Sequence, residues 1–311
     1  MSLKEIKGRI LSVQTTQKTT SAMRMVASAK LHRTQNMTQT FLAYVGEMQK
    51  IIDSLQPRRS VQTAGDRSAR CNKIALVSIS SSSGLCGAFN SNIAKETFRK
   101  IELYKSQGKE VVVIPVGKKI AHELHKAGID ILLDYYLLTD YLGNPKADAY
   151  AHTAFLVEHL VRMFNEGHID GVEILYHHFR NMGSQVITSE WLDIATDKDD
   201  SDDPQVDEGT DAVSEAAPQT AVATSHTSFL TEPSPSALLA ELHPKMLNAK
   251  MYGILLDSVT SEHAARMMAM QTADDNAKEL LQELTLLYNK SRQQAITNEL
   301  IDIMGGKAGS N

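Results

Sequence analysis

The stretch SEHAARMMAMQTADDNAKELLQELTLLYNKSRQQAITNELIDIMGG, residues 261–306, decides how this sequence folds. It contains no proline, and its first glycine is Gly305, so nothing before that position breaks a helix. Its apolar residues recur at steps of three and four, the spacing of a coiled-coil seam: Ala277, Leu280, Leu284, Leu287, Ile296, Leu300 and Ile303. We expect a helix over residues 236–305, ended by Gly305 and Gly306 as C-cap residues.

The other end of the chain predicts a second long helix, within residues 1–57. The first proline is Pro57, and only Gly8 and Gly46 weaken a helix before it. A helix from about Ser2 to Gln56 would be about 80 Å long. Its seam is predicted at Ile6, Ile10, Val13, Met37, Phe41, Tyr44, Met48, Ile51 and Leu55. Between the two halves of this seam, QTTQKTTS (residues 14–21) is polar on nearly every face.

The middle of the chain has a different periodicity. Short, β-branched apolar runs at 73–80, 110–116, 171–179 and 185–188 indicate strands. Helical spacing occupies 92–107, 118–127 and 147–166. Strands that alternate with helices favour a Rossmann-like open α/β domain, which we place at residues 72–193. A polar linker at 58–71 precedes this domain.

Together these patterns predict a mixed α+β and α/β fold. The two terminal helices form a long antiparallel coiled coil, since neither could bury its apolar seam alone, and the α/β domain is inserted at one end. Residues 194–235 are rich in Asp, Ser, Thr, Ala and Pro and are expected to be a disordered acidic insert. Residues 306–311 form a short tail.

Charge is distributed unevenly along the chain. The formal net charge is −5, so no global positive field is available to bind nucleic acid. Residues 1–46 carry seven basic side chains and one acidic one, whereas residues 197–215 are strongly acidic. No run approaches the ~18 apolar residues of a membrane span, and the N-terminus has no signal or transit pattern. With only two cysteines, unpaired by spacing, the expected setting is reducing and non-secreted.

Three segments of the sequence allow an enzymatic or metal-binding interpretation beside a structural one. The loop SSSGLCGAF (residues 81–89) follows a strand, but it matches neither phosphate-binding glycine pattern, so a tight turn with Asn90 or Ser91 as helix cap is favoured. Cys86 lies near a helix N-terminus but has no neighbouring His or acid in sequence. A zinc motif would need one more residue between Glu123 and His125 than this sequence has after His122. The neighbours His177 and His178 should point to opposite faces of a strand.

Both ends of the chain resemble one known family. LKEIKGRILSVQTTQKTTSAMRMVASAKL (residues 3–31) is similar to the N-terminal signature of ATP synthase gamma subunits, and residues 261–306 resemble their C-terminal signature. The middle departs from the family: a loop of the type Asp-Arg-Gly-Leu-Cys-Gly-Gly-Phe-Asn is here Ser82-Ser83-Gly84-Leu85-Cys86-Gly87-Ala88-Phe89-Asn90. The acidic insert is not part of the resemblance either.

The resemblance implies a central-stalk rotor of an F-type, proton-translocating ATP synthase, with no catalytic site, cofactor or metal of its own. Its implied partners are the alpha and beta subunits of the head, one copy per three of each, together with the epsilon subunit and the membrane rotor c-ring. Neither nucleic acid nor direct membrane insertion is expected. The implied location is peripheral, on the cytoplasmic face of a bacterial inner membrane.

The same resemblance assigns partner-contact residues. It places contacts with the catalytic head at Met23, Arg24, Arg266, Arg292, Gln293 and Thr297, and an apolar tip in a bearing at Ile301, Ile303 and Met304. By residue type alone, a Met stripe or an exposed helical Arg is more often structural. A static coiled-coil tether is the non-enzymatic alternative. The polar stretch 14–21 argues against it, since a tether would be expected to keep its seam apolar throughout.

Overall fold

The computed structural model describes residues 2–55, 71–129, 131, 135–142, 148–194, 232 and 234–308. The predicted linker at 58–71 and acidic insert at 194–235 lie almost entirely outside these residues. Within them, the predicted fold class is confirmed: two long terminal helices form an antiparallel pair, and a mixed α/β sheet lies between them in the sequence. The exact division into domains stays a prediction.

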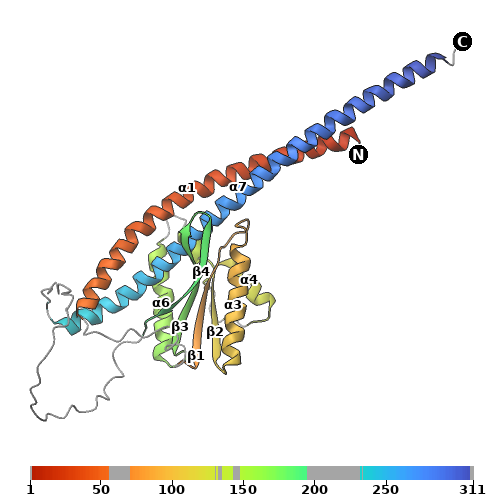
Figure 1. Cartoon of the computed structure of the whole chain (residues 1–311). Helices are drawn as coiled ribbons and strands as arrows, with labels where there is room; N and C mark the ends of the chain where they lie inside the picture. The colour runs from red at the N-terminus through yellow and green to blue at the C-terminus, as the bar shows by residue number, and fades with distance from the viewer. Residues whose placement is uncertain are drawn as a thin grey trace, which may run out of the picture.

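Two long helices run along the length of the molecule (Figure 1). Helix α1 spans Leu3–Leu55 and helix α7 spans Pro235–Ala308, which makes them about 80 and 110 Å long. They run antiparallel, and the end of α7 extends beyond the start of α1. Helix α7 includes Pro244 and continues through Gly305 and Gly306, so the prediction that these two glycines end it is wrong. Both glycines lie inside the helix, which continues to Ala308.

The seam of α1 is less apolar than its sequence predicts. The side chains of α1 that are buried are Ile6, Ala27, Leu31, Thr34, Thr38, Met48 and Ile52. The hydroxyl oxygens of Thr38 and Thr260 lie 3.2 Å apart across the pair, and each hydroxyl also has a carbonyl of its own helix within hydrogen-bond distance. Since each hydroxyl has one hydrogen, one of them can donate across the pair while the other donates within its own helix. Met37 and Tyr44, which were predicted in the seam, are exposed instead. Small threonines let the two helices approach closely, while their hydroxyl groups keep hydrogen bonds.

The seam of α7 is buried only where α1 faces it. Ala277 and Leu284 are buried, whereas the predicted seam residues Leu280 and Leu287 are exposed although α1 lies beside them. The predicted seam residues Ile296 and Leu300, at the end of α7, are exposed as well. Gln17 Nε2 donates to Asp274 Oδ1 at 3.1 Å, which marks the antiparallel register. By that pairing, α1 begins opposite about residue 288 of α7, and Figure 1 shows α7 continuing past this point. The last turns of α7 therefore stand alone.

The domain between the helices contains a four-stranded sheet in the order β2-β1-β3-β4. Its strands are β1 (Lys73–Ile79), β2 (Glu110–Val116), β3 (Gly171–Asn181) and β4 (Ser184–Leu192). Strand β1 pairs in parallel with both β2 and β3, and β4 returns antiparallel to β3 as a hairpin. The predicted strands are confirmed, and the fourth is longer than its apolar core suggested.

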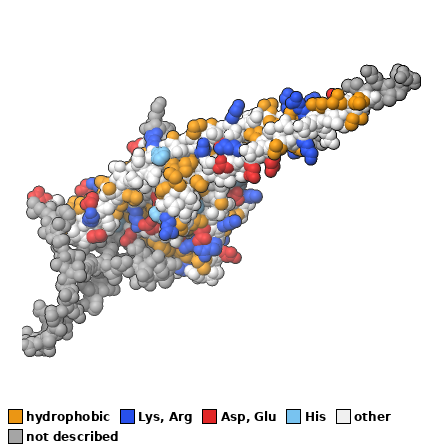
Figure 2. Space-filling model, turned by 45° about the horizontal axis from the view of Figure 1, so that its top comes forward, with side chains coloured by type: hydrophobic (Ala, Val, Ile, Leu, Met, Phe, Trp, Pro, Cys, Tyr) orange, Lys and Arg blue, Asp and Glu red, His pale blue; other side chains and the backbone are white. Residues whose placement is uncertain are grey.

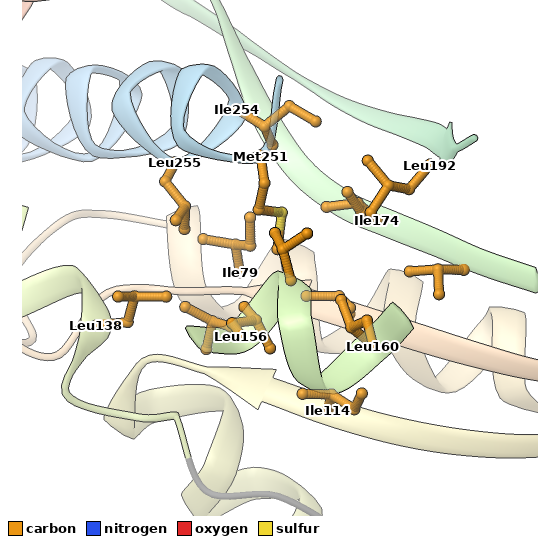
Figure 3. Packing of buried hydrophobic residues seen from close by; sticks show 14 of the residues in the cluster. Ile79, Ile114, Leu138, Leu156, Leu160, Ile174, Leu192, Met251, Ile254 and Leu255 are labelled. Atoms are coloured by element: carbon orange, nitrogen blue, oxygen red, sulfur yellow. The ribbon is translucent and has the colours of Figure 1, made fainter. Parts of the chain in front are cut away.

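Helices cover both faces of this sheet. The helices α3 (Phe89–Ser106) and α4 (Lys118–Lys126) cover one face, where Leu76, Val113 and Leu175 are buried against them. On the other face, α6 (Ala149–Asn165) and α7 enclose a larger core, part of which Figure 3 shows around Ile79, Ile174 and Leu255. Alternate residues of β1 thus enter different cores, as strand geometry requires.

The domain lies beside the helical pair and not beyond its end. Met251 and Leu255 of α7 are fully buried in the larger core, so this helix belongs both to the helical pair and to the domain.

A short helix, α5 (Leu138–Leu142), was not predicted, since five residues give too little periodicity. The N-cap of α3 is Ala88, without a side-chain cap, so Asn90 and Ser91 are not caps as predicted. Asn90 Oδ1 instead accepts from the Ser81 N–H and hydroxyl.

Candidate partner-contact site

A groove of about 470 Å³ lies between the two long helices and the loop that follows β1. Two residues of the predicted contact set, Met23 on α1 and Arg266 on α7, line it together. The other lining residues are Thr19, Ala22, Val26, Ala27, Lys30, Ser83, Gly84, Leu85 and His263. The groove exists because the antiparallel register brings residues about 240 positions apart in sequence to the same level.

Arg266 of α7 binds the loop that follows β1. Its Nη1 lies 2.7 Å from Glu262 Oε1 in an ion pair whose two side chains are both largely buried. Its Nη2 donates to Ser83 Oγ at 2.7 Å and reaches the carbonyl oxygens of Ser83 and Gly84 at 3.4 Å. The serine that replaces a charged residue of the family loop therefore provides an acceptor for Arg266.

The clamped loop presents a strained, exposed leucine. Leu85 has φ 61°, a left-handed conformation that costs a non-glycine residue energy, and its side chain is 63% exposed. It lies on the groove wall with Met23 and Val26, which are also exposed. Exposed apolar side chains in one groove indicate a surface that is covered by another protein.

Two cationic side chains, Lys30 and Arg266, line the groove, and none of its lining residues is Asp or Glu. Because Arg266 is paired with Glu262, Lys30 is the source of the groove's net positive charge. Burial, helped by the nearby cations Arg266 and Lys30, lowers the pKa of His263 to about 4, so this imidazole is neutral at pH 7. Neither of its ring nitrogens has a hydrogen-bond partner among the described residues. Burial also raises the pKa of Glu262 against the opposing effect of Arg266.

Arg24 lies close to this groove but does not line it. Its Nη1 donates to Gln271 Oε1 on α7, which joins the two helices at the residue that follows Met23. Asp274 of α7 lies near Arg24, and its carboxylate pairs with Lys278 Nζ at 2.8 Å. Arg24 is half-buried, and its guanidinium already has an intramolecular partner in Gln271.

Three other predicted contact residues lie on the part of α7 that has no α1 beside it. Arg292, Gln293 and Thr297 are exposed. The Thr297 hydroxyl donates to the Gln293 carbonyl at 2.9 Å, within the helix. The Arg292 guanidinium has no ion-pair partner within the part of the chain that the structure describes. This free cation can reach a carboxylate on another molecule.

The predicted apolar tip is exposed. The side chains of Ile301 and Met304 are exposed, and Met304 is 75% exposed. Leu286, Ile296 and Leu300 are exposed as well. Figure 2 shows hydrophobic side chains and Lys or Arg side chains together along this projecting end. The side chain of Ile303 lies outside the described residues. An isolated helix with this much apolar surface is expected to be enclosed by other protein.

Sequence reasoning missed Lys30, Leu85 and His263 as parts of the groove. Lys30 and His263 could be found only from the tertiary structure, whereas the glycine-containing loop, with its left-handed turn, was a weak signal for Leu85.

His177 is buried and His178 is exposed, which confirms that they point to opposite faces of β3. Cys86 is buried and accepts a hydrogen bond from Asn90 Nδ2 at 3.0 Å.

The described residues offer no cluster of three or more His, Cys, Asp or Glu that could hold a metal. His122 and His125 of α4 are both exposed. A search of the described helices finds none that combines the length and apolar character needed to cross a bilayer.

Comparison with known proteins places these features in a family. The family model described as ATP synthase matches residues 2–309. The ATP synthase gamma chain of Parabacteroides distasonis is 44% identical over 312 residues, covering 100% of this chain and 99% of that one. That of Flavobacterium johnsoniae is 34% identical, covering 100% and 99%.

Solved structures share the fold. The rotor of the Euglena gracilis mitochondrial ATP synthase matches with a TM-score of 0.61 at 19% identity, covering 94% of this chain and 98% of that one. The central stalk of the Tetrahymena thermophila mitochondrial ATP synthase matches with a TM-score of 0.51 at 20% identity, covering 82% and 98%. With full-length relatives at these identities, the chain belongs to the ATP synthase gamma chain family.

Proposed function

We propose that this chain, as the gamma chain and central-stalk rotor of an ATP synthase, has no catalytic site of its own and transmits rotation through surface contacts. The observation that carries this proposal is the end of α7, which stands alone beyond α1 with Ile301 and Met304 exposed. Apolar side chains on a single helix are stable there only inside a sleeve formed by other subunits.

The sleeve in this proposal is a ring of three alpha and three beta subunits around one gamma chain. A single helix has no threefold symmetry, so each catalytic subunit meets a different face of it. Contacts that differ between faces favour different conformations of the surrounding subunits, and rotation then moves those preferences around the ring. Arg292, with no intramolecular ion pair among the described residues, and Gln293 and Thr297 beside it, are the proposed polar contacts at this level.

The groove is the second proposed contact with the head. Its cations and exposed apolar side chains suit a segment that combines carboxylates with apolar residues, and Met23 and Arg266 lie on its wall. Since Arg266 already pairs with Glu262 and Ser83, its contribution includes holding Leu85 in place for that segment. Arg24 lies next to the groove and extends its positive charge.

The opposite end of the molecule is the proposed site of coupling to the membrane. The epsilon subunit and the rotor c-ring contact the α/β domain and the lower part of the helical pair, and proton flow through the membrane part turns them together. In this proposal the assembly lies on the cytoplasmic face of a bacterial inner membrane, and the chain is attached peripherally through its partners. Family membership supports this arrangement.

The test is reconstitution with the alpha and beta subunits of the source organism. We expect one copy of this chain per six-subunit ring by native mass measurement, and ATPase activity that depends on its presence. The double variant Arg292→Ala, Gln293→Ala should lower ATP-driven rotation rate or assembly affinity about tenfold, the effect of losing ~1.4 kcal/mol. The control is Arg99→Ala, an exposed arginine on α3. A free chain that leaves the ring unchanged would instead support a static tether.

A further inference from the structure

A second pocket, of about 420 Å³, lies between the two long helices and the β3–β4 hairpin, nearer to the end of α1 than the groove is. It is lined by residues of the range 42–49 in α1, by side chains of β3 and β4, and by residues of the range 246–257 in α7. None of the predicted partner contacts lies in it. Its volume is within the range of about 300–1,000 Å³ that small organic ligands occupy.

Two glycines leave this pocket open. Gly46 of α1 and Gly253 of α7 both line it, although glycine destabilises a helix interior relative to alanine. A Cβ atom on Gly46 would have no described atom within 4 Å, and one on Gly253 would meet Phe41 and Leu42 at an ordinary 3.9 Å. Packing within the described chain therefore does not require glycine at either place. Glycine at both places leaves room for a ligand close to the helix backbones.

Much of the lining is apolar. Leu42 and Val45 come from α1, and Met246 and Ile254 come from α7. Leu42 is 52% exposed, so part of this apolar surface is in contact with solvent when the pocket is empty. An apolar lining in a pocket of this size favours a ligand with an apolar body.

The carboxylate of Glu190 can accept further hydrogen bonds. The Tyr176 hydroxyl donates to its Oε2 at 3.2 Å, and Lys250 Nζ lies 3.2 Å from its Oε1. The side chains of Lys250 and Glu190 are 32% and 36% exposed, so their ion pair is partly solvated and weak. Each carboxylate oxygen can accept from two donors, which leaves room on both for a donor of a ligand.

A second carboxylate, that of Asp257, is fixed in the same lining. Its Oδ1 accepts from the Phe179 N–H at 2.9 Å, and its Oδ2 lies 2.6 Å from His178 Nδ1. When Nδ1 donates to Asp257, Nε2 of His178 is an acceptor, and no described residue donates to it. The polar lining thus has more acceptors than donors.

The charges that line the pocket favour a cation. Two carboxylates, Glu190 and Asp257, stand against one ammonium group, that of Lys250. Burial raises the pKa of the Tyr176 phenol, and the charges of Glu190 and Asp257 raise it further, so the potential at this lining residue is negative.

We propose that this pocket binds a small amphipathic amine, whose ammonium group contacts Glu190 and whose apolar body lies against Leu42, Val45 and Met246. The site is separate from the groove, where Lys30 and Arg266 select the opposite charge. It does not depend on the proposed rotary function.

Methionine methyl groups can report on the two sites separately. Met246 lines the pocket and Met23 lines the groove. The full chain would be labelled with ¹³C-methyl methionine, and both signals would be assigned by Met→Leu substitutions. Hexylammonium chloride is the probe; hexanol, hexanoate and ammonium chloride are the controls for charge, sign of charge and apolar body. We expect saturable shifts of Met246 and not of Met23 with hexylammonium, and binding of hexanol about tenfold weaker. Hexanoate and ammonium chloride should not shift Met246.

Variants connect the shifts to the pocket. Glu190→Gln keeps the shape and removes the charge, so it should weaken hexylammonium binding about tenfold. The matched control is Glu47→Gln, since Glu47 also pairs with a lysine, Lys50 at 2.7 Å, but does not line the pocket. Gly46→Leu should fill the pocket and abolish binding. Gly8→Leu, at the other glycine of α1 with no described atom within 4 Å of an added Cβ, should leave binding unchanged.

Four results would contradict the proposal. The first is the absence of a saturable shift of Met246. The second is equal binding of hexylammonium and hexanol, which would show that charge does not select the ligand. The third is unchanged binding in Gly46→Leu, which would place the amine elsewhere. The fourth is a shift of Met246 when the epsilon subunit is added without amine, which would assign the pocket to a protein partner.

Discussion

Removing the Arg266 guanidinium should destabilise the chain by more than its visible hydrogen bonds suggest. In Arg266→Ala, Glu262 keeps a buried carboxylate without its 2.7 Å partner. Breaking a buried ion pair from one side costs about 3–5 kcal/mol, because a charge stays buried and uncompensated. The loss of the donor to Ser83 Oγ and to the loop carbonyls is part of the same change.

A double-mutant cycle separates the two contributions. Glu262→Gln combined with Arg266→Ala removes the buried charge as well, so the loss should fall to about 1–3 kcal/mol, the contribution of charge-assisted hydrogen bonds to the loop. Ser83→Ala tests one of these bonds alone and should cost about 1 kcal/mol. Urea unfolding, followed by circular dichroism and by the fluorescence of Trp191, the single tryptophan, gives the free energies of unfolding.

The cost of Arg266→Ala should also depend on pH. Burial raises the pKa of Glu262, and loss of Arg266 raises it further, since Arg266 is the largest opposing influence. The penalty is therefore complete above the raised pKa and decreases as the pH falls through it, because a protonated carboxyl group is no longer a buried charge. Equal losses for the single and double variants, with no dependence on pH, would refute this account of the clamp.

Three further predictions concern packing, backbone and titration. Leu31→Ala should cost about 2–5 kcal/mol, because this side chain is fully buried between the long helices, whereas Leu11→Ala, at a site 66% exposed, should change stability by less than about 0.5 kcal/mol in the same urea assay. Gly117→Ala should leave little folded protein by circular dichroism, because φ is 105° there and an added Cβ would lie 2.3 Å from the Ser80 carbonyl oxygen; normal folding would contradict that geometry. Burial lowers the pKa of His177 to about 4, below its unfolded value of ~6.5, so stability should be complete above about pH 6.5 and decline as the pH falls toward 4; His177→Gln should flatten that decline in thermal melts at stepped pH.

The sequence predicted the elements well where their periodicity was long or their strands strongly apolar. Both terminal helices and all four strands were found from spacing and β-branched runs, with ends shifted by only a few residues. The predicted end of the last helix was wrong: glycines often end helices as C-cap residues, but here the helix continues through Gly305 and Gly306 to Ala308. The prediction also missed the five-residue helix α5, which is too short for any periodic signal.

Seam residues were predicted less well, for a physical reason. A step of three and four marks every residue that could face a partner, but burial also requires a partner at that level. Ala277 and Leu284 are buried because α1 lies beside them, whereas Ile296 and Leu300 have the same spacing and stay exposed beyond its end. In α1, Thr34 and Thr38 occupy the seam, although polarity alone would assign them to the surface.

By itself, the sequence determined which segments are helical, which are strands, and that the two terminal helices must pair. These properties follow from residue spacing and local propensity, which act over a few neighbours. Only the tertiary structure decided which distant residues meet: Arg266 with Ser83, Met23 with His263 across the groove, and His177 with the start of α3. Their meeting depends on the register of two helices and on the side of the sheet that each element covers, and no local interaction encodes either.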